Sequence, residues 1–433
     1  MKKSFLWLAL SVALVSCTQD ALEDLPLPDA AGTESFKISP EEAQAELASF
    51  MAELEGTGSH KLGVAPKRFA KVRALRRDMH VRSIGLDDPE VEDIDIDTLM
   101  YAINFADNQG FALVAADRRT SPILAIVDEG NFHPDSLTED ADEGFLSFVS
   151  NAIDMELQDI QGYEKTFHTT QTQPGDYSIV QRYKPMLHTK WGQGGDYGKY
   201  CPNRVAGCVM VAIAQILSYY QTVSRVSWSD RSDNGTSGAS DLHWDRIIAD
   251  CDRCGGKLGH SSCAASADEV AHLLRYLGVA LGAEYKKKGM YGETGAKSSN
   301  AIDWFNKWGL LNATPLTSYN ESAIIAAIKS RNLVYGRGAT GKKKFLGIKI
   351  GYKGGHAWVY DGALITYKDG VSTNYVHCNW GWYGNKNGYY LSRVFDTNAG
   401  PVSYDPTDNL PVITDSAPYY CYNLEYSIIT RRN

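Results

Sequence analysis

The stretch that decides the fold is CPNRVAGCVMVAIAQILSYYQ, residues 201–221. Its second cysteine, Cys208, follows a glycine and opens fourteen residues that carry almost no charge. A free cysteine in a protein core usually behaves as a small inert hydrophobe. A cysteine at the start of a helix lies beside unpaired backbone N–H groups and the helix dipole, which both favour the thiolate. The pattern therefore allows an inert or a reactive Cys208, and the rest of the chain has to decide.

The first residues, MKKSFLWLALSVALVSC, combine a basic start, a short apolar run and small residues before Cys17. The run is too short to span a bilayer stably and is typical of a signal peptide. The residues before Cys17 resemble a bacterial lipobox, so we expect residues 1–17 to end at a lipidated cysteine. An ordinary secretory signal cleaved nearby is the alternative. Residues 18–35 are acidic and non-periodic and are predicted to be a tether. We thus expect an exported protein, lipid-anchored to the bacterial cell envelope or surface.

Length and charge limit the classes of protein that fit. The chain has 433 residues, long enough for two domains, and a formal net charge of −9 at pH 7. An acidic balance argues against a nucleic-acid partner, because nucleic-acid phosphates demand a basic face. The 25 tyrosines and nine tryptophans indicate a well-packed globular protein and not a disordered chain.

Residues 36–164 are predicted to form a small α+β domain with no obvious catalytic set. The motif SPEE at 39–42 has the residue types of a capping box and predicts a helix start. The turn signal DNQG at 107–110, between two apolar runs, predicts a β-hairpin. The polar segment 165–178 contains Pro-Gly and is the predicted linker to the next domain.

The remaining residues, 179–433, are predicted to form one domain of ordinary size. Its first half is helical, comprising the Cys208 segment and SADEVAHLLRYLGVALG, residues 266–282. Its second half has strand patterns in HAWVYDGALITY (356–367), NYVHCNWGW (374–382) and GYYLSRVF (388–395). The domain is therefore expected to be α+β, with a helical half followed by a sheet half.

A reactive thiol needs an imidazole close by that can return a proton to the leaving group. Among ten histidines, His356 stands directly after two glycines at the start of a predicted strand, a position suited to access. His377 is its main rival, but its place inside an alternating strand favours a structural histidine. Asn379 supplies an amide that can hold the His356 ring in its useful tautomer. Trp380 and Trp382 are placed to shield that hydrogen bond from water, although plain core residues would look the same.

Three segments together resemble the streptopain family of papain-like cysteine peptidases. They are HTKWGQGGDYGKYCPNRVAGCVMVAIAQILSYYQ (188–221), GGHAWVYDG (354–362) and VHCNWGWYGNKNGYY (376–390). The upstream segment GFALVAADRRTSPILAIVDEG (110–130) resembles the propeptide of the same family. The resemblance implies a papain-like catalytic fold in which the Cys208 helix is the central core helix, preceded by a prodomain at 36–164.

The resemblance also implies a role for each matching residue. Cys208 would be the nucleophile, and His356 the general base and acid. Gln193 matches the glutamine whose amide forms the oxyanion hole together with the Cys208 backbone N–H. Asn379 and Trp380, with Trp382, match the segment behind the histidine. This chain departs from the family in the loop before His356, where Lys342, Lys343, Lys344 and the residues after them make the loop longer.

A second group of cysteines lies in CDRCGGKLGHSSC, residues 251–263. Its three thiols and one imidazole have the residue types of a tetrahedral zinc site, but in an exported chain this spacing more often means a disulfide. We expect a disulfide, with zinc and free thiols as the alternatives. Cys201 is expected to be a structural thiol or half of a disulfide, Cys378 is expected to pack in a strand, and Cys421 is unassigned.

The sequence therefore predicts a lipid-anchored zymogen of a cysteine endopeptidase that cleaves peptide bonds through a thioester acyl-enzyme. Its partners would be protein or peptide substrates, its own prodomain as an intramolecular inhibitor, and the membrane through the lipid on Cys17. No cofactor is expected beyond a reduced thiol. Cleavage in the linker would release the mature form. Two alternatives remain open: a transglutaminase-like acyl transferase, and a non-catalytic surface lipoprotein that binds peptide or glycan.

Overall fold

The computed structural model describes most of the chain from Phe36 onward. The described residues are 36–56, 67–76, 97–134, most of 145–160, 177–259, 261–288, 291–338, 342–345, 348–351, 355–368, 370–395 and 424–432. The predicted signal peptide and tether, most of the predicted linker, His260 and Cys421 lie outside these residues. In the part of the chain that the structure describes, no helix has the length and apolar character needed to cross a membrane.

The N-terminal elements include helix α1 and a four-stranded antiparallel meander. Helix α1 (Pro40–Gly56) begins at the predicted capping box, where Ser39 N donates to Glu42 Oε2 at 2.7 Å and Glu42 N donates to Ser39 Oγ at 3.2 Å. The strands are β1 (Phe69–Arg76), β2 (Thr98–Phe105), β3 (Phe111–Ala115) and β4 (Ile123–Val127). The described residues between 145 and 160 are helical, as their amphipathic pattern predicts.

The predicted hairpin joins β2 to β3 through the short helix η1 (Ala106–Asn108). Asp107 and Asn108 adopt left-handed conformations with φ of 57° and 60°, and Gly110 follows with φ of 97°. Asparagine, aspartate and glycine tolerate such φ values better than other residues, and this is why the turn is local to these positions. A side chain at position 110 would also collide with the backbone of Val127 on β4.

Most strands in the C-terminal half of the chain form a large antiparallel sheet. Its main strands are β12 (Leu333–Gly338), β15 (His356–Lys368), β16 (Val371–Asn379), β17 (Gly388–Leu391) and β18 (Glu425–Arg431). Shorter strands complete it: β5 (Ser178–Tyr183) on β15, and β10 (Leu311–Ala313) and β11 (Thr317–Ser318) on β18. Helices α9 (Glu321–Lys329) and η5 (Ser392–Phe395) pack beside its strands.

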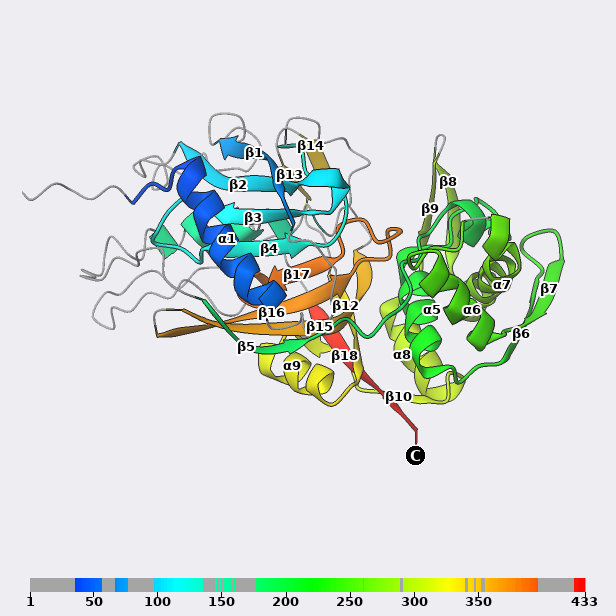
Figure 1. Ribbon diagram of the computed structural model, residues 1–433. Helices are drawn as coiled ribbons and strands as arrows, with labels where there is room; N and C mark the ends of the chain where they lie inside the picture. Colours follow the sequence, from blue (N-terminus) through cyan, green and yellow to red (C-terminus); the bar gives the residue numbers. More distant parts are fainter. Residues whose placement is uncertain are drawn as a thin grey trace, which may run out of the picture. The chain divides into compact units, whose positions relative to one another are not determined.

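The N-terminal meander and the C-terminal strands form one continuous sheet. Strand β4 pairs with β17, with Ala125 opposite Tyr390 and Val127 opposite Gly388, so the strand order runs β1-β2-β3-β4-β17-β16-β15-β12-β18-β10. Figure 1 shows this continuity, with β1 to β4 in blue and cyan followed by β17, β16 and β15 in orange. The N-terminal elements therefore join the C-terminal half through backbone hydrogen bonds at a sheet edge.

The helical half lies between β5 and β12 in the chain. It contains α5 (Cys208–Tyr220), α6 (Trp244–Arg253), α7 (Ala264–Ala280) and α8 (Ser298–Lys307), shown in green in Figure 1. Helix α5 is buried on every side from Val209 to Ser218 and packs on β15 and α7, as its uncharged sequence predicts. The fold is α+β and papain-like, with a helical half, an antiparallel sheet half and a preceding α+β region, as the sequence predicted.

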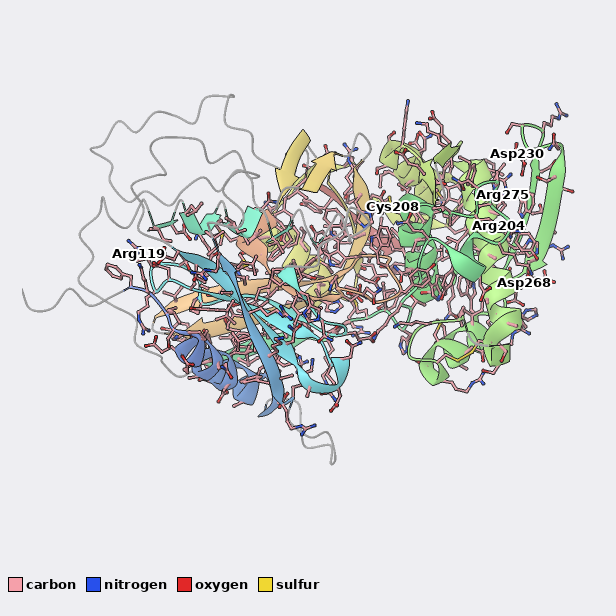
Figure 2. All side chains as sticks on the ribbon, turned by 90° about the horizontal axis from the view of Figure 1, so that it is seen from above. Arg119, Arg204, Cys208, Asp230, Asp268 and Arg275 are labelled. Carbon is pink, nitrogen blue, oxygen red and sulfur yellow. A yellow bond between two sulfur atoms is a disulfide. The ribbon has the colours of Figure 1, made fainter. Side chains whose placement is uncertain are left out.

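The described chain also contains three two-stranded hairpins: β6 (Arg225–Asp230) with β7 (Thr236–Asp241), β8 (Glu284–Lys288) with β9 (Tyr291–Gly295), and β13 (Lys342–Phe345) with β14 (Ile348–Gly351). The last of these is the long segment before His356. The first is held to α7 by the fully buried Arg275, whose Nη2 lies 2.6 Å from Asp230 Oδ2 (Figure 2).

The structure pairs Cys254 with Cys263 in a disulfide, as expected for the 251–263 group. This bond uses two of the four groups that a zinc site would have needed. Cys201 and Cys251 are buried free thiols, and Cys378 is buried in β16. Burial raises the pKa of the Cys201 and Cys251 thiols to about 11, so both behave as packed structural groups.

Candidate active site

Cys208 is the first residue of helix α5, and the glycine before it determines how the thiol is presented. Gly207 has φ of 94°, a conformation that favours glycine, and a Cβ there would lie within 3.0 Å of Met210 and Thr294 atoms. Cys208 is partly exposed, whereas Cys201, Cys251 and Cys378 are buried. The backbone N–H of Cys208 belongs to the first turn of the helix, where N–H groups have no intrahelical partner. An anion beside Cys208 would be stabilised there.

His356 is the first residue of β15, opposite Gly338 of β12. His356 is 6% exposed, and its ring is stacked with the rings of Trp358 and Trp382. Burial lowers the pKa of His356 to about 4, although the hydrogen bond to Trp380 opposes the shift. The imidazole is therefore neutral at pH 7 in this structure and can accept a proton.

The tautomer of His356 follows from its contacts. Nε2 lies 2.9 Å from the carbonyl oxygen of Trp380 and 3.3 Å from the indole Nε1 of Trp382. A carbonyl only accepts and an indole N–H only donates, so the two contacts require opposite tautomers. The shorter one assigns the proton to Nε2. Nδ1 then keeps the free lone pair that a general base needs.

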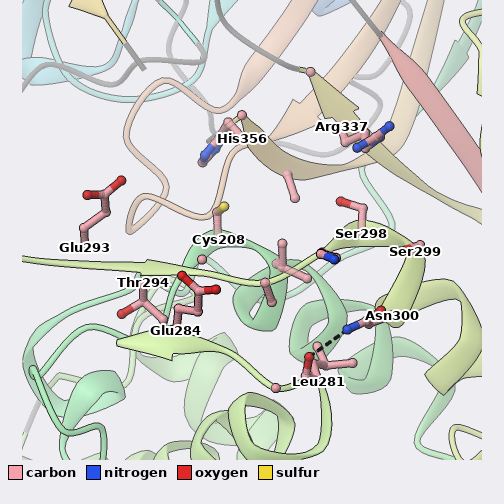
Figure 3. Close-up of a pocket in the computed structure, with 18 of the residues that line it drawn as sticks. Cys208, Leu281, Glu284, Glu293, Thr294, Ser298, Ser299, Asn300, Arg337 and His356 are labelled. Atoms are coloured by element: carbon pink, nitrogen blue, oxygen red, sulfur yellow. Dashed lines mark hydrogen bonds between the residues drawn. The ribbon is translucent and has the colours of Figure 1, made fainter. Parts of the chain in front are cut away.

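Cys208 and His356 border one cavity of about 750 Å³. Figure 3 shows the two side chains on facing walls, with the sulfur of Cys208 directed toward the His356 side. Glu284 and Glu293 line one end of the cavity, and Arg337 lines the other. Arg337 is neutralised by Glu425, whose Oε2 lies 2.6 Å from its Nε. The lining carries charged and small polar groups around the thiol, enough to hold an extended polar ligand such as a peptide.

The structure corrects the expected role of the Asn379 side chain. Both ends of this buried amide are used away from His356: Nδ2 donates to Thr189 O at 2.8 Å, and Oδ1 accepts from Gln215 Nε2 at 3.1 Å. The ring of His356 is held by the backbone carbonyl of the next residue, Trp380. Every residue has a backbone carbonyl, so the sequence cannot indicate which carbonyl contacts His356. For this reason the Asn379 side chain was the expected partner.

Trp380 is thus joined to His356 through its carbonyl, while its indole is buried in an aromatic cluster with Trp358, Tyr390 and Phe395. The backbone N–H of Trp380 donates to Asn387 Oδ1 at 3.1 Å, and the peptide group that carries its carbonyl is held through Gly381 N, which donates to Asn379 Oδ1 at 3.3 Å. The Asn379–His356 hydrogen bond that Trp380 and Trp382 were expected to shield is not formed among the described residues; both rings instead lie beside the His356 ring.

Gln193 lies in a loop that the structure attaches to the Cys208 turn. Its carbonyl accepts from Ala206 N at 2.7 Å, two residues before Cys208. Tyr383 secures the same loop, because Tyr383 N donates to Trp191 O at 3.1 Å and its hydroxyl accepts from Gly194 N at 2.9 Å. Gln193 is not among the described residues that line the cavity. The structure therefore holds the Gln193 backbone next to the Cys208 turn and does not bring the Gln193 side chain into the cavity lining.

His377, the rival histidine, lies outside the cavity lining and is a buried ion-pair residue. Its Nδ1 is 2.6 Å from Asp361 Oδ1, and its Nε2 is 3.0 Å from Asp128 Oδ2. Burial opposes its charge, but the two carboxylates outweigh burial and raise the pKa of His377 to about 10. It is a charged structural histidine, in agreement with the strand pattern.

Asp128 follows β4, so this ion pair crosses from the N-terminal elements to the C-terminal sheet. Neighbouring contacts also cross there: Asp128 N donates to Asn387 O at 2.8 Å, and Glu129 pairs with Lys190 and, at 3.0 Å, with Lys257. None of the described residues before 161 lines the Cys208 cavity. The N-terminal elements therefore contact the segment behind His356 without entering the cavity through any described residue.

Comparison with known proteins identifies both parts of the chain. The model of the Peptidase C10 family matches residues 191–390, and that of the Spi protease inhibitor matches residues 80–153. By this match the chain contains a Peptidase C10 region, residues 191–390. It is a cysteine-type endopeptidase that carries a propeptide inhibitor region, and the predicted resemblance to the streptopain family is confirmed. Below, residues 191–390 are called the peptidase region and residues 80–153 the inhibitor region.

Two solved structures of C10 peptidases are similar to this chain. One is a cysteine-to-alanine mutant fragment of Prevotella intermedia prointerpain A, 20% identical, with a TM-score of 0.49, covering 77% of this chain and 96% of that one. The other is active Prevotella intermedia interpain A cysteine protease, 23% identical, with a TM-score of 0.37, covering 58% of this chain and 95% of that one. No curated protein matches the chain.

Proposed function

We propose that this C10 peptidase hydrolyses peptide bonds with Cys208 as nucleophile and His356 as general base and acid. The observation that carries the proposal is that both side chains border one cavity while Nε2 of His356 is engaged by the Trp380 carbonyl. That arrangement leaves Nδ1 as the nitrogen that takes a proton from the thiol. A substrate carbonyl carbon between the two walls is then open to attack by the sulfur.

The reaction follows in two steps. The Cys208 sulfur bonds to the carbonyl carbon, its proton passes to His356, and His356 returns that proton to the leaving amine as the C–N bond breaks. Water then attacks the thioester, gives one proton to His356, and the C–S bond breaks with return of the proton to sulfur. The Cys208 N–H and the Gln193 side chain stabilise the oxyanion that forms in each step. A reduced thiol is the only requirement, with no cofactor.

Replacement of the nucleophile and of the base tests this proposal. Because the two act as a unit, Cys208→Ala and His356→Ala should each abolish peptide hydrolysis by the purified full-length protein. Matched controls are Cys201→Ala, a buried thiol outside the cavity lining, and His188→Ala, an exposed histidine. Both controls should keep wild-type turnover. Hydrolysis by folded Cys208→Ala protein at the wild-type rate would contradict the assignment.

We further propose that the protein is made as a zymogen, with residues 36–164 as inhibitory prodomain and cleavage within 165–178. Support comes from the inhibitor-family match and from the sheet pairing of β4 with β17. Replacing residues 165–176 by a Gly/Ser linker should give a protein that stays intact and has low activity. If that uncleavable protein is as active as the processed enzyme, the N-terminal elements are not an inhibitor.

Export with a lipid on Cys17 completes the proposal, and it rests on the lipobox-like sequence before that residue. The full-length protein expressed in a bacterium should partition into the detergent phase, whereas Cys17→Ser protein should partition into the aqueous phase. A Cys17→Ser protein that still partitions with detergent would remove the anchor from the proposal. Proteolytic processing in the 165–178 segment should release the peptidase region from the membrane.

A further inference from the structure

Gln215 is the polar exception in an otherwise apolar helix. It lies in the middle of α5, seven residues after Cys208, and its side chain is fully buried. A buried amide without hydrogen-bond partners destabilises the fold, so its partners explain why it is tolerated.

All partners of the Gln215 side chain lie on two other segments. Its Oε1 accepts from the backbone N–H of Trp191 at 3.2 Å and from Thr189 Oγ1 at 3.4 Å. Its Nε2 donates to Asn379 Oδ1 at 3.1 Å. The circuit closes because Asn379 Nδ2 donates to Thr189 O at 2.8 Å. One side chain thus joins the segment at 189–191 to the end of strand β16.

These two segments carry the groups that must face Cys208. Trp191 is two residues before Gln193, whose loop is attached to the Cys208 turn. Asn379 is one residue before Trp380, whose carbonyl holds Nε2 of His356. The helix that carries Gln215 begins with Cys208 itself. The Gln215 side chain therefore connects the helix of Cys208, the strand end next to Trp380 and the loop of Gln193.

We propose that Gln215 is a positioning residue that sets His356 and Gln193 in register with Cys208. The inference rests on the proposed roles of those three residues. Gln215 does not touch the substrate. It acts by holding the segments that carry His356 and Gln193 at a fixed position relative to the helix that carries Cys208. A misplacement of about 1 Å in such a site can reduce the rate about 100-fold. Because Asn379 precedes Trp380, loss of the Gln215–Asn379 hydrogen bond is predicted to displace the Trp380 carbonyl that contacts His356.

Two variants separate positioning from simple core packing. Gln215→Met keeps the approximate length of the side chain and removes every hydrogen bond. Gln215→Glu keeps the acceptor for Trp191 and Thr189, but its carboxylate cannot donate to Asn379. A buried glutamate titrates at raised pH, and its protonated form regains the donor. If the Asn379 link positions His356, acid should therefore rescue this variant.

The measurements use the full-length protein. We expect kcat of Gln215→Met to fall by about 10- to 100-fold, with KM little changed. Alkylation of Cys208 by iodoacetamide, mapped by mass spectrometry, should slow and its pH profile should shift. Activity of Gln215→Glu, divided by that of wild type at each pH, should rise as pH falls. The control is Tyr220→Phe, which removes the buried hydroxyl contacts of the same helix with Ile429 and Leu333; it should lower the melting temperature and keep kcat.

Three results would overturn the inference. The first is alkylation of Cys208 in Gln215→Met at the wild-type rate and with the wild-type pH profile. The second is a loss of kcat in Tyr220→Phe as large as that in Gln215→Met. The third is an activity of Gln215→Glu, relative to wild type, that does not change with pH. The alkylation result does not need peptide turnover. If wild type hydrolyses no peptide but Cys208 alkylation still depends on Gln215, the proposed peptidase chemistry fails and the positioning role stands.

Discussion

Nε2 of His377 lies 3.0 Å from Oδ2 of Asp128, so a histidine of the peptidase region is ion-paired with a carboxylate of the inhibitor region. The same ring contacts Asp361 through Nδ1 at 2.6 Å. One imidazolium therefore bridges one carboxylate from each region. His377 lies on β16, which ends at Asn379. The contact between the regions therefore lies on the strand that leads to Trp380, whose carbonyl contacts His356.

The first prediction concerns stability against pH. The pKa of His377 is raised from 6.5 to about 10 in the folded protein, so the folded state holds a proton that the unfolded state releases between these values. The stability that His377 contributes is present below pH 6.5 and is lost as pH rises toward 10. Urea unfolding of Cys208→Ala protein, which cannot cleave itself, should show this slope. In the Cys208→Ala, His377→Gln double variant the slope should be smaller, and an unchanged slope would refute the assignment.

The second prediction tests the sheet edge between the regions. A Cβ at Gly388 would lie 2.3 Å from the carbonyl oxygen of Ile126 on β4, and neither backbone can yield easily. Such overpacking typically costs about 1–3 kcal/mol. Gly388→Ala should therefore weaken docking of the inhibitor region, and the unprocessed protein should hydrolyse peptide faster than unprocessed wild type. The processed enzymes should be equally active.

The control for this variant is Gly259→Ala, where a Cβ would meet only the Asp196 carboxylate at 4.0 Å. It should behave as wild type before and after processing. If Gly388→Ala protein remains as inactive as unprocessed wild type, pairing of β4 with β17 is not what transmits inhibition.

The third prediction concerns Gln193. Its backbone is held beside the Cys208 turn by Ala206, so truncation of the side chain should leave the loop in place. Gln193→Ala should lower kcat by about 100- to 1,000-fold, as for loss of one oxyanion donor, and should change KM much less. The oxyanion forms only after attack, which is why kcat carries the effect. An effect confined to KM would instead make Gln193 a ground-state binding residue.

The fourth prediction concerns the Cys254–Cys263 disulfide. Reduction should increase the intact mass by two hydrogen atoms, and Cys254→Ser should lower the free energy of unfolding by about 2 kcal/mol. Neither cysteine lines the Cys208 cavity, so peptide hydrolysis should persist. Elemental analysis should find no stoichiometric zinc. Zinc bound in a one-to-one ratio and lost in Cys254→Ser would contradict the disulfide.

Features that depend on neighbours in the chain could be predicted from the sequence. The capping box at Ser39 and Glu42 closes within four residues, and the turn before Gly110 needs only local φ preferences. The uncharged run after Cys208 predicts a buried helix with a thiol at its start, since helix burial follows from the residues of that helix alone. The candidate nucleophile and base were also identifiable, because glycines next to Cys208 and His356 mark positions of access.

Tertiary structure alone decided how these pieces meet. The Asn379 side chain was expected to contact His356, but its Oδ1 accepts a hydrogen bond from Gln215, which lies 164 residues earlier. The backbone carbonyl of Trp380 contacts His356 instead. Asp128 and His377 are 249 residues apart, and their contact exists because β4 pairs with β17 in one register. Hydrogen bonds between distant segments depend on strand register and on which face a side chain occupies. A shift of one residue reverses that face, and neither composition nor local pattern encodes the register between two such strands.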